Sequence, residues 1–346
     1  MSKFLLVGDV HLDINEPREK QVDINGHLAS GRILTKLEML KKTVALAIQH
    51  KVDWYIDLGD LFNHLNPSEW LRELYSKNVL APLLKHGIKI RLIAGNHGNE
   101  KTSIALRSLK DINLNFFFDD VFAEIEPGIY VLPFYPLKEQ DKLQELLSPI
   151  RHGVLFTHLP ISGAKNYSEF ALEGFPLGMF NVLDLVVSGH YHRQQQIDNI
   201  FYLGSLGSNN WSEPGGERRG VVIYDSNKAT LSTFPVMDKI FVNWYHALPN
   251  DIIDYLEKAN SWKDITVKIK VSGTKSQLIT FNHKDVMAYL YSKGAHLVYI
   301  DYEQVEDNER NTVLVDSAQS NDKIMLDIAK GDTKLVEFGK QFLVEK

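Results

Sequence analysis

Five short polar motifs follow apolar, strand-like segments of this chain, and their side chains are of the types that bind metal ions. In chain order they are Asp9-Val10-His11, Gly59-Asp60, Gly95-Asn96-His97, Thr157-His158 and Gly189-His190-Tyr191-His192. Carboxylate, amide and imidazole ligands without sulfur suit Mn²⁺, Fe or Zn²⁺. Each motif is short enough to arise by chance, but the ordered set predicts a metal centre.

Asp60 is the residue around which this set is organised. The segment from Asp53 to Leu58 is apolar and β-prone, and Gly59 interrupts it. Asp60 would therefore lie just past the carboxyl end of a buried strand, where open α/β sheets place their ligands. Because a carboxylate has two oxygens, we expect Asp60 to bridge two cations.

The elements that must position these motifs form an alternating α/β pattern. Apolar residues from Ile33 to Ile48 recur at helical spacing, and a second helical stretch begins at Pro67 and ends near Gly87. Residues 15–31 are expected to form a loop. The strands before the motifs are predicted at residues 4–8, 53–58, 88–93, 152–157 and 184–188. A further strand is predicted at 128–133, and short strands of a second sheet at 200–203, 220–224 and 230–234.

Composition narrows the class of protein. A chain of 346 residues is long enough for a full core and more than one domain. The absence of cysteine excludes disulfides and thiolate metal sites, which fits a cytoplasmic location. No apolar run reaches membrane-spanning length, so no membrane partner is expected. A net charge of -6 argues against sequence-blind coating of nucleic acid but allows a local basic groove.

In its motifs the sequence resembles the calcineurin-like metallophosphoesterases, over roughly residues 1–240. Gly59-Asp60-Leu61-Phe62 followed by Asn66-Pro67-Ser68 is similar to the SbcD-type nucleases. These are the nuclease subunits of ATP-driven complexes that repair double-strand breaks. The resemblance implies an α/β fold with a calcineurin-like two-sheet β-sandwich flanked by helices.

The resemblance also implies a role for each motif residue. One cation would be held by Asp9, His11, Asp60 and His192, and the other by Asp60, Asn96, His158 and His190. The two divalent metal ions would be Mn²⁺, as is typical of the family's nucleases. Two cations about 4 Å apart can clamp the attacking and leaving oxygens of a displacement at phosphorus. His97 resembles the family's catalytic histidine, which stabilises the transition state or protonates the leaving oxygen.

Two positions depart from the family pattern. Asn63 stands where many of these nucleases have a histidine, with His64 beside it, and Gly98 stands where an acidic residue usually orients the catalytic histidine. Glu100 is a candidate substitute for that acid. Candidate substrate contacts are Asn63, His64 and Arg193, with further phosphate-binding candidates at Arg32, Arg218 and Arg219.

We expect three parts in the chain: a nuclease domain at 1–247, a small α+β capping domain at 248–316 and a helical tail at 317–346. In the family the capping domain helps to select DNA; alternatively, this one only buries the edge of the main sheet. The tail either binds the coiled coil of an SbcC-type ATPase, as in the family, or packs on its own domain. A helix around Trp70 is a candidate for homodimerisation.

The function that the resemblance implies is a Mn²⁺-dependent DNA exo/endonuclease subunit in DNA repair and recombination, located in the cytoplasm of a bacterial cell and encoded by the bacterium or by a phage. Double-strand DNA ends and the ATPase would be its partners. Protein phosphatases of this fold usually show a GDxxDR pattern, and Leu61-Phe62-Asn63-His64 counts against that branch. The alternatives are another metallophosphoesterase, either a phosphatase or a cyclic-nucleotide phosphodiesterase, or a weakly active scaffold that binds DNA ends.

Overall fold

The computed structural model describes residues 2–12, 21–64, 67–97, 116–119, 121–209, 213, 219–236, 240–246, 252–257, 262–263 and 265–305. The chain divides into two compact units. The first comprises residues 1–15, 33–209 and 218–237, and the second comprises residues 16–32, 210–217 and 238–346.

The first unit contains a six-stranded sheet in the order β14-β13-β1-β4-β5-β6. Its strands β1 (Lys3–Val7), β4 (Trp54–Asp57), β5 (Lys89–Ile93) and β6 (Phe116–Asp119) run parallel. Strands β13 (Gly220–Asp225) and β14 (Thr230–Pro235) complete the sheet in antiparallel pairing on the other side of β1. The carboxyl ends of β1, β4 and β5 therefore lie at the same edge of this sheet.

A second six-stranded sheet has the order β11-β12-β10-β9-β8-β7. Strands β8 (Ile129–Leu132), β9 (Val154–Thr157), β10 (Leu185–Ser188) and β12 (Ile200–Tyr202) are parallel neighbours. The outer strands β7 (Ala123–Glu126) and β11 (Gln195–Ile197) pair antiparallel to β8 and β12. Here too the ends of β9 and β10 lie side by side.

The two sheets pack face to face around a shared apolar core. Side chains alternate along a strand, so Phe4 and Leu6 of β1 and Trp54 and Ile56 of β4 point the same way, into this core. They meet residues of the second sheet, including Val131, Phe156 and Val187, and all of these are buried. Burial of this area drives formation of the sandwich.

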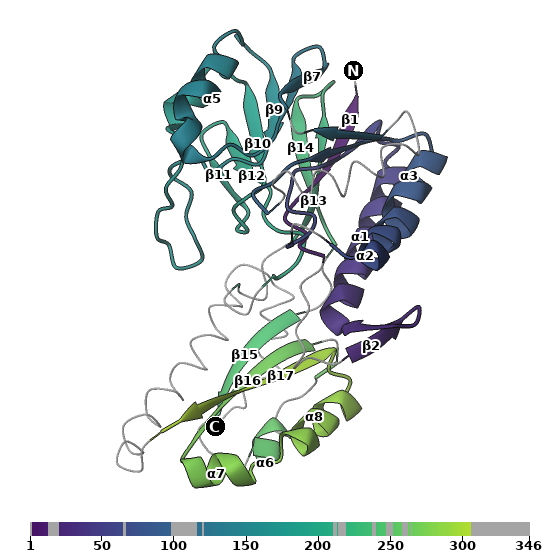
Figure 1. Cartoon of the computed structure of the whole chain (residues 1–346), viewed down its shortest axis with the longest axis vertical. Helices are drawn as coiled ribbons and strands as arrows, with labels where there is room; N and C mark the ends of the chain where they lie inside the picture. Colours follow the sequence, from purple (N-terminus) through teal and green to yellow (C-terminus); the bar gives the residue numbers. More distant parts are fainter. Residues whose placement is uncertain are drawn as a thin grey trace. The chain divides into compact units, whose positions relative to one another are not determined.

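Helices flank both sheets (Figure 1). On the side of the first sheet lie α1 (Gly31–Gln49), α2 (Glu69–Tyr75), the π-helical turn η1 (Ser76–Leu80) and α3 (Ala81–Lys85). Ser68 caps α2 by accepting a hydrogen bond from Leu71 N at 3.3 Å. Against the second sheet pack α5 (Gln140–Leu147), which follows the 3₁₀ turn η3 (Leu137–Glu139), and the 3₁₀ turn η4 (Leu177–Phe180).

The second unit contains a parallel three-stranded sheet of β15 (Ile240–His246), β16 (Ile265–Gly273) and β17 (Leu297–Gln304). The helices α6 (Ile252–Leu256), α7 (Lys275–Thr280) and α8 (His283–Ser292) supply its other elements, and side chains of α6, α8, β16 and β17 share one core. A hairpin of β2 (Gln21–Ile24) and β3 (His27–Ser30) belongs to the same unit.

The predicted fold class is confirmed: the described residues form a helix-flanked two-sheet sandwich with an additional α+β module. Three expectations differ from the structure. Strands β13 and β14 extend the first sheet through β1 and do not join the second. Residues 21–30 form a hairpin where a loop was expected. Strand β15 precedes the boundary expected after residue 247, yet it pairs with β16 in the second unit's sheet.

The predicted tail at 317–346 and residues Gly98, Glu100 and Arg218 lie outside the described residues. Among the helices that the structure describes, none combines the length and the apolar character that crossing a membrane requires.

The apolar cluster between α5 and the second sheet gives a test of the packing. Leu143 of α5 is buried in it, whereas Leu137, at the start of η3, is 41% exposed. We expect Leu143→Ala to lower the free energy of unfolding by about 2–5 kcal/mol, because it removes buried methyl groups and leaves a cavity. The matched change Leu137→Ala should alter it by less than about 0.5 kcal/mol. Urea denaturation measures both, and equal effects would contradict the packing described.

Candidate metal centre

The candidate ligands all lie in segments that directly follow strands of the first unit. Asp9 and His11 follow β1, Asp60 follows β4 and Asn96 follows β5. From the second sheet, His158 follows β9, and His190 and His192 follow β10. Parallel pairing brings these strand ends together, so residues far apart in the sequence gather at one site.

The backbone at this site adopts an uncommon conformation. Asp9, His11, Asp60 and His190 have φ values of 50°, 47°, 55° and 82°. Non-glycine residues seldom occupy this left-handed region, and where they do the surrounding structure must hold them there. Here Asp9 N donates to Gly59 O at 3.0 Å and His11 N donates to Asp60 O at 2.9 Å. The turns after β1 and β4 therefore stabilise each other.

Glycines in the motifs let the ligands approach the backbone closely. A Cβ atom at Gly95 would lie 2.2 Å from Oδ1 of Asp60, and one at Gly59 would lie 2.6 Å from Nδ1 of His158. At Gly189 a Cβ would lie 2.8 Å from Nδ1 of His158 and 2.9 Å from Oδ2 of Asp9. A larger residue at these positions would displace the ligand side chains. The motif glycines are therefore part of the site.

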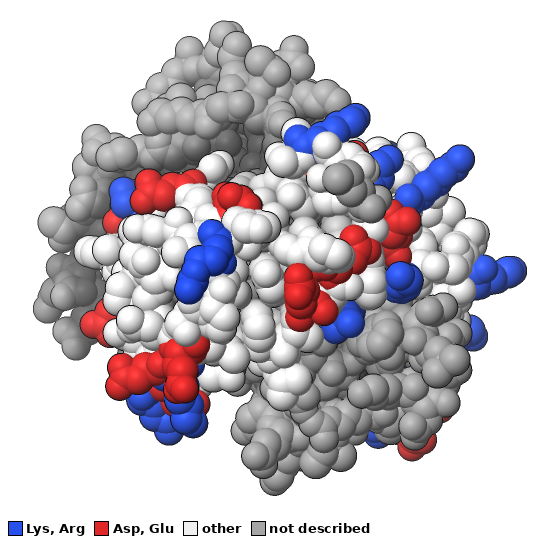
Figure 2. Space-filling view, turned by 90° about the horizontal axis from the view of Figure 1, so that it is seen from above, with Lys and Arg blue, Asp and Glu red and all other residues white. Residues whose placement is uncertain are grey.

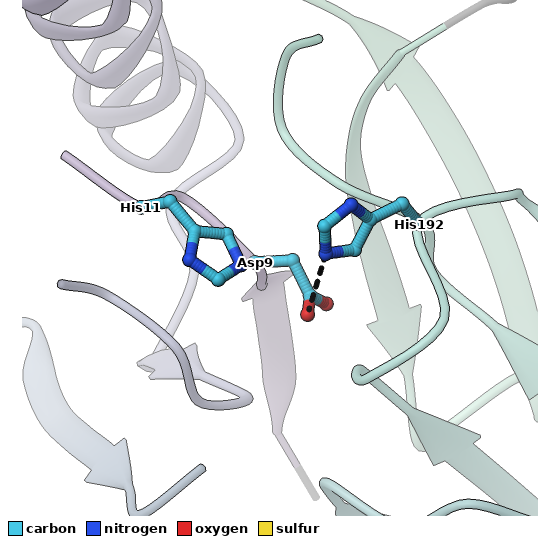
Figure 3. Close-up of side chains that lie close together, drawn as sticks. All are labelled: Asp9, His11 and His192. Atoms are coloured by element: carbon cyan, nitrogen blue, oxygen red, sulfur yellow. Dashed lines mark ion pairs between the residues drawn. The ribbon is translucent and has the colours of Figure 1, made fainter. Parts of the chain in front are cut away.

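Asp9, His11 and His192 form a first cluster, with ligand atoms that all lie within 4.8 Å of one another (Figure 3). Nε2 of His192 lies 3.7 Å from Oδ1 of Asp9. The rings of His11 and His192 lie 5.2 Å apart between centroids and are tilted by 60° to each other. Asp60 adjoins this cluster, since its Oδ2 lies 3.9 Å from Nε2 of His11.

Asp60, Asn96, His158 and His190 form a second cluster. Nε2 of His158 lies 3.2 Å from Oδ2 of Asp60 and 3.0 Å from Oδ1 of Asn96. Nδ1 of His190 lies 2.8 Å from the same oxygen of Asn96. Nδ1 of His158 donates to Leu58 O at 2.8 Å, which orients Nε2 toward the cluster. Asp60 is thus shared between the two clusters.

Burial and mutual charge set the ionisation of these groups. Burial raises the pKa of Asp9 to about 6, and it lowers the pKa of His190 to about 3. Burial, followed by the positive charge of Lys36, lowers the pKa of His11 well below its usual value. Burial opposes ionisation of Asp60 and His158, but their ion pair wins, so the pKa of Asp60 falls and that of His158 rises. His11 and His190 are therefore neutral near pH 7, as a metal ligand must be.

The donor set fits a divalent-metal centre. Both ring nitrogens of His11 are buried without a hydrogen-bond partner in the part of the chain that the structure describes. Buried polar atoms normally have a partner, and an imidazole that lacks one beside two carboxylates is suited to bind a cation. Oxygen and imidazole nitrogen ligands of this kind would hold Mn²⁺, Fe or Zn²⁺.

His97 lies beside the two clusters. Its backbone N–H donates to Oδ1 of Asp60 at 2.9 Å, and its Nδ1 lies 3.1 Å from the carbonyl oxygen of Asn63. Its ring meets that of His11 edge-on, with centroids 4.9 Å apart. A carbonyl can only accept, so Nδ1 of His97 carries a proton there. The carbonyl of Asn63 thus orients His97 in the way that the family's acidic residue was expected to do.

The remaining candidate contacts are placed differently. His64 is exposed. Arg193 forms an ion pair with Glu169 at 2.6 Å and donates to Asn166 O at 2.9 Å. The structure therefore brings the metal candidates and His97 together, whereas it directs the Arg193 guanidinium to a neighbouring loop. Substrate contact by Asn63, His64 and Arg193 stays a prediction.

Three residues that support the site were not singled out from the sequence. Asp57 of β4 is buried and accepts a hydrogen bond from Gly59 N at 3.0 Å, and burial raises its pKa to about 8. Lys36 and Asn209 bind the backbone of the turn after β1. A signal for Lys36 existed, because it stands at helical spacing between the apolar residues Ile33 and Leu40.

Comparison with protein families decides the class. The family model described as calcineurin-like phosphoesterase matches residues 2–194. The chain belongs to the calcineurin-like phosphoesterase family. All of the candidate ligands and His97 fall inside the matched segment, which supports a metal-dependent phosphoester hydrolase. No curated protein matches the sequence significantly.

Solved structures that resemble this calcineurin-like chain include a dimetal phosphatase from Danio rerio, with 13% identity, a TM-score of 0.41 and coverage of 64% of this chain and 91% of that one. A protein from Thermus thermophilus has 13% identity, a TM-score of 0.43 and coverage of 68% and 99%. A phosphoesterase from E. coli has 14% identity, a TM-score of 0.31 and coverage of 68% and 99%.

Substitution of Gly95 tests whether the ligands need this close approach. We expect Gly95→Ala to weaken Mn²⁺ binding by at least about tenfold, because the added Cβ collides with the carboxylate of Asp60. Gly178→Ala is the matched control, since a Cβ there meets no atom within 4 Å. Isothermal titration calorimetry measures both. Unchanged Mn²⁺ affinity in Gly95→Ala would show that Asp60 does not bind the metal in this position.

Proposed function

We propose that this calcineurin-like phosphoesterase is the Mn²⁺-dependent nuclease subunit of an SbcC–SbcD-type complex, which hydrolyses phosphodiester bonds at double-strand DNA ends. The observation that carries the proposal is the segment Gly59-Asp60-Leu61-Phe62 at the centre of the site, which is followed by Asn63 in place of the family's histidine. In sequence it is similar to the SbcD-type nucleases. In the structure it links the shared carboxylate of Asp60 to the histidine His97.

The packing of Phe62 explains how this segment acts. Phe62 is buried, and its ring meets that of Tyr75 on α2 edge-on, with centroids 6.3 Å apart. This contact anchors the loop between β4 and α2. The anchored loop then presents Asn63 O to Nδ1 of His97 at 3.1 Å. The Leu-Phe pair of the motif thus fixes the ring that is proposed to act on the substrate.

The candidate metal ligands and His97 have different roles in the proposed hydrolysis. Two divalent cations, when bound, would supply Lewis-acid activation of a phosphodiester and stabilise the negative charge that develops on its oxygens. Asp60 would be shared between the cations, with Asp9, His11 and His192 on one side and Asn96, His158 and His190 on the other. His97, held through Nδ1, would donate the proton on its Nε2 to the leaving oxygen. No side chain is needed as nucleophile.

The charge distribution is compatible with DNA as substrate. On the face drawn in Figure 2, the described Lys and Arg residues are interspersed with Asp and Glu, and neither sign covers a continuous area. Bound cations are often the largest local charges in such a site. We therefore propose that the metal centre supplies much of the positive potential that attracts the DNA backbone. The α+β module would contact DNA, and the segment 317–346 would bind the ATPase. Helix α2 would mediate a homodimer.

Replacement of His97 tests its role. We expect His97→Ala to reduce Mn²⁺-dependent hydrolysis of DNA by about 10²–10⁴-fold, because the proton transfer is lost. Bound Mn²⁺, measured by elemental analysis of the purified protein, should stay at the wild-type level. His152→Ala, at an exposed position before β9, is the control and should retain full activity. Near-normal hydrolysis by His97→Ala would contradict the assignment.

The choice of substrate is tested by comparing linear duplex DNA with bis-p-nitrophenyl phosphate in the presence of Mn²⁺. We expect cleavage of DNA, with a binding affinity that falls steeply as salt rises, because phosphate contacts release counterions. A protein that hydrolyses only the small diester, or binds DNA independently of salt, would instead be a phosphatase or a cyclic-nucleotide phosphodiesterase. Salt-dependent binding without cleavage would indicate a DNA-end scaffold.

A further inference from the structure

A buried lysine lies behind the candidate metal centre. Lys36 of α1 is only 2% exposed. Its Nζ donates to the carbonyl oxygens of Val10 at 2.6 Å and His11 at 2.8 Å, and to Oδ1 of Asn209 at 2.5 Å. A lysine ammonium has three donors and no acceptor, so these bonds use all of its protons. A buried charge is costly unless it is bonded in this way.

Asn209 extends this contact to two of the candidate ligands. Its Nδ2 donates to the carbonyl oxygen of Asp9 at 3.1 Å and lies 3.5 Å from Nδ1 of His192. Asn209 is itself buried. Together Lys36 and Asn209 bind the carbonyl oxygens of three consecutive residues, Asp9 to His11.

The turn after β1 is therefore held from both sides. Its N–H groups, from Asp9, His11 and Leu12, donate to carbonyl oxygens of the turn after β4. Its carbonyl oxygens accept from Lys36 and Asn209. Left-handed φ is unfavourable for a non-glycine residue, and Asp9 and His11 both adopt it. The lysine and the asparagine offset part of this cost in the conformation that directs both side chains into the site.

The partners of this network belong to the first cluster. Lys36 binds the backbone of His11, whereas Asn209 binds the backbone of Asp9 and approaches the ring of His192. In the second cluster, His158 is oriented by Leu58 O and His190 by Asn96. The bonds of Lys36 and Asn209 reach the first cluster, whereas the second cluster meets the turn after β1 through the N–H of His190, which donates to the carboxylate of Asp9 at 3.1 Å.

We propose that Lys36, acting with Asn209, is a positioning residue that sets the metal affinity of the Asp9, His11 and His192 cluster and affects that of the second cluster much less. The inference rests on the metal centre of the proposed function and is independent of the choice of DNA as substrate. Neither residue touches the reacting atoms; each acts through the ligands that it holds.

The test uses the full chain with Lys36→Met, which keeps an unbranched side chain and removes all three donors. Mn²⁺ binding is measured by isothermal titration calorimetry and by electron paramagnetic resonance. We expect one of two Mn²⁺ sites to weaken by about 10–100-fold, as for other residues that support metal ligands. The spectrum should change from a coupled Mn²⁺ pair to a single isolated ion. Lys41→Met, at an exposed position of the same helix, should leave both sites intact.

Asn209→Ala provides a second variant. It removes the bonds to Asp9 and Lys36, and because asparagine is neutral the substitution removes no charged group. It should show the same loss at one site, and it decides the matter if Lys36→Met does not fold. Retained binding at the other site shows that the fold is intact.

Wild-type affinity at both sites in the folded variants, or an equal loss at both, would overturn the proposal. These outcomes are distinct from failure of the nuclease assignment, in which the wild-type protein binds two Mn²⁺ ions but does not cleave DNA.

Discussion

The carboxylate of Asp60 is the point on which the rest of the site depends. Its Oδ1 accepts the N–H of His97, and its Oδ2 lies 3.2 Å from His158 and 3.9 Å from His11. These partners come from the loops after β1, β5 and β9, so one side chain links both sheets of the sandwich. A buried carboxylate is tolerated only where such partners surround it. Its position at the end of β4, past Gly59, makes that possible.

The surrounding fold stabilises the strained residues and buried charges of this site. Four of the candidate ligands occupy left-handed φ, and three motif glycines keep the space around Asp60, Asp9 and His158 open. Hydrogen bonds between the two turns, the buried Lys36 and Asp57 beneath Gly59 hold this arrangement. Strain and buried charge of this kind are typical of functional sites, where they persist because the scaffold over-determines the geometry.

The strands that precede the site and the candidate ligands could be predicted from the sequence. A buried strand has a strong apolar signal, and the polar motifs mark where β1, β4, β5, β9 and β10 end, so parallel pairing brings the ligands together. The partners of β13 and β14 could not be predicted, because periodicity identifies a strand but not its neighbours. The β2–β3 hairpin was missed because its strands are only four residues long and half of their residues are polar, which leaves a weak strand signal. Lys36 was missed because a lysine on a helix is usually solvent-exposed, and only the tertiary fold shows the carbonyls that it binds.

The central claim is that Asp60 is shared by two cations, and anomalous diffraction from crystals grown with Mn²⁺ tests it most directly. The account predicts two anomalous peaks about 4 Å apart, one on each side of Asp60. One should lie among Asp9, His11 and His192, and the other among Asn96, His158 and His190. Crystals without a peak at Asp60, or with these imidazoles turned away from the peaks, would contradict it.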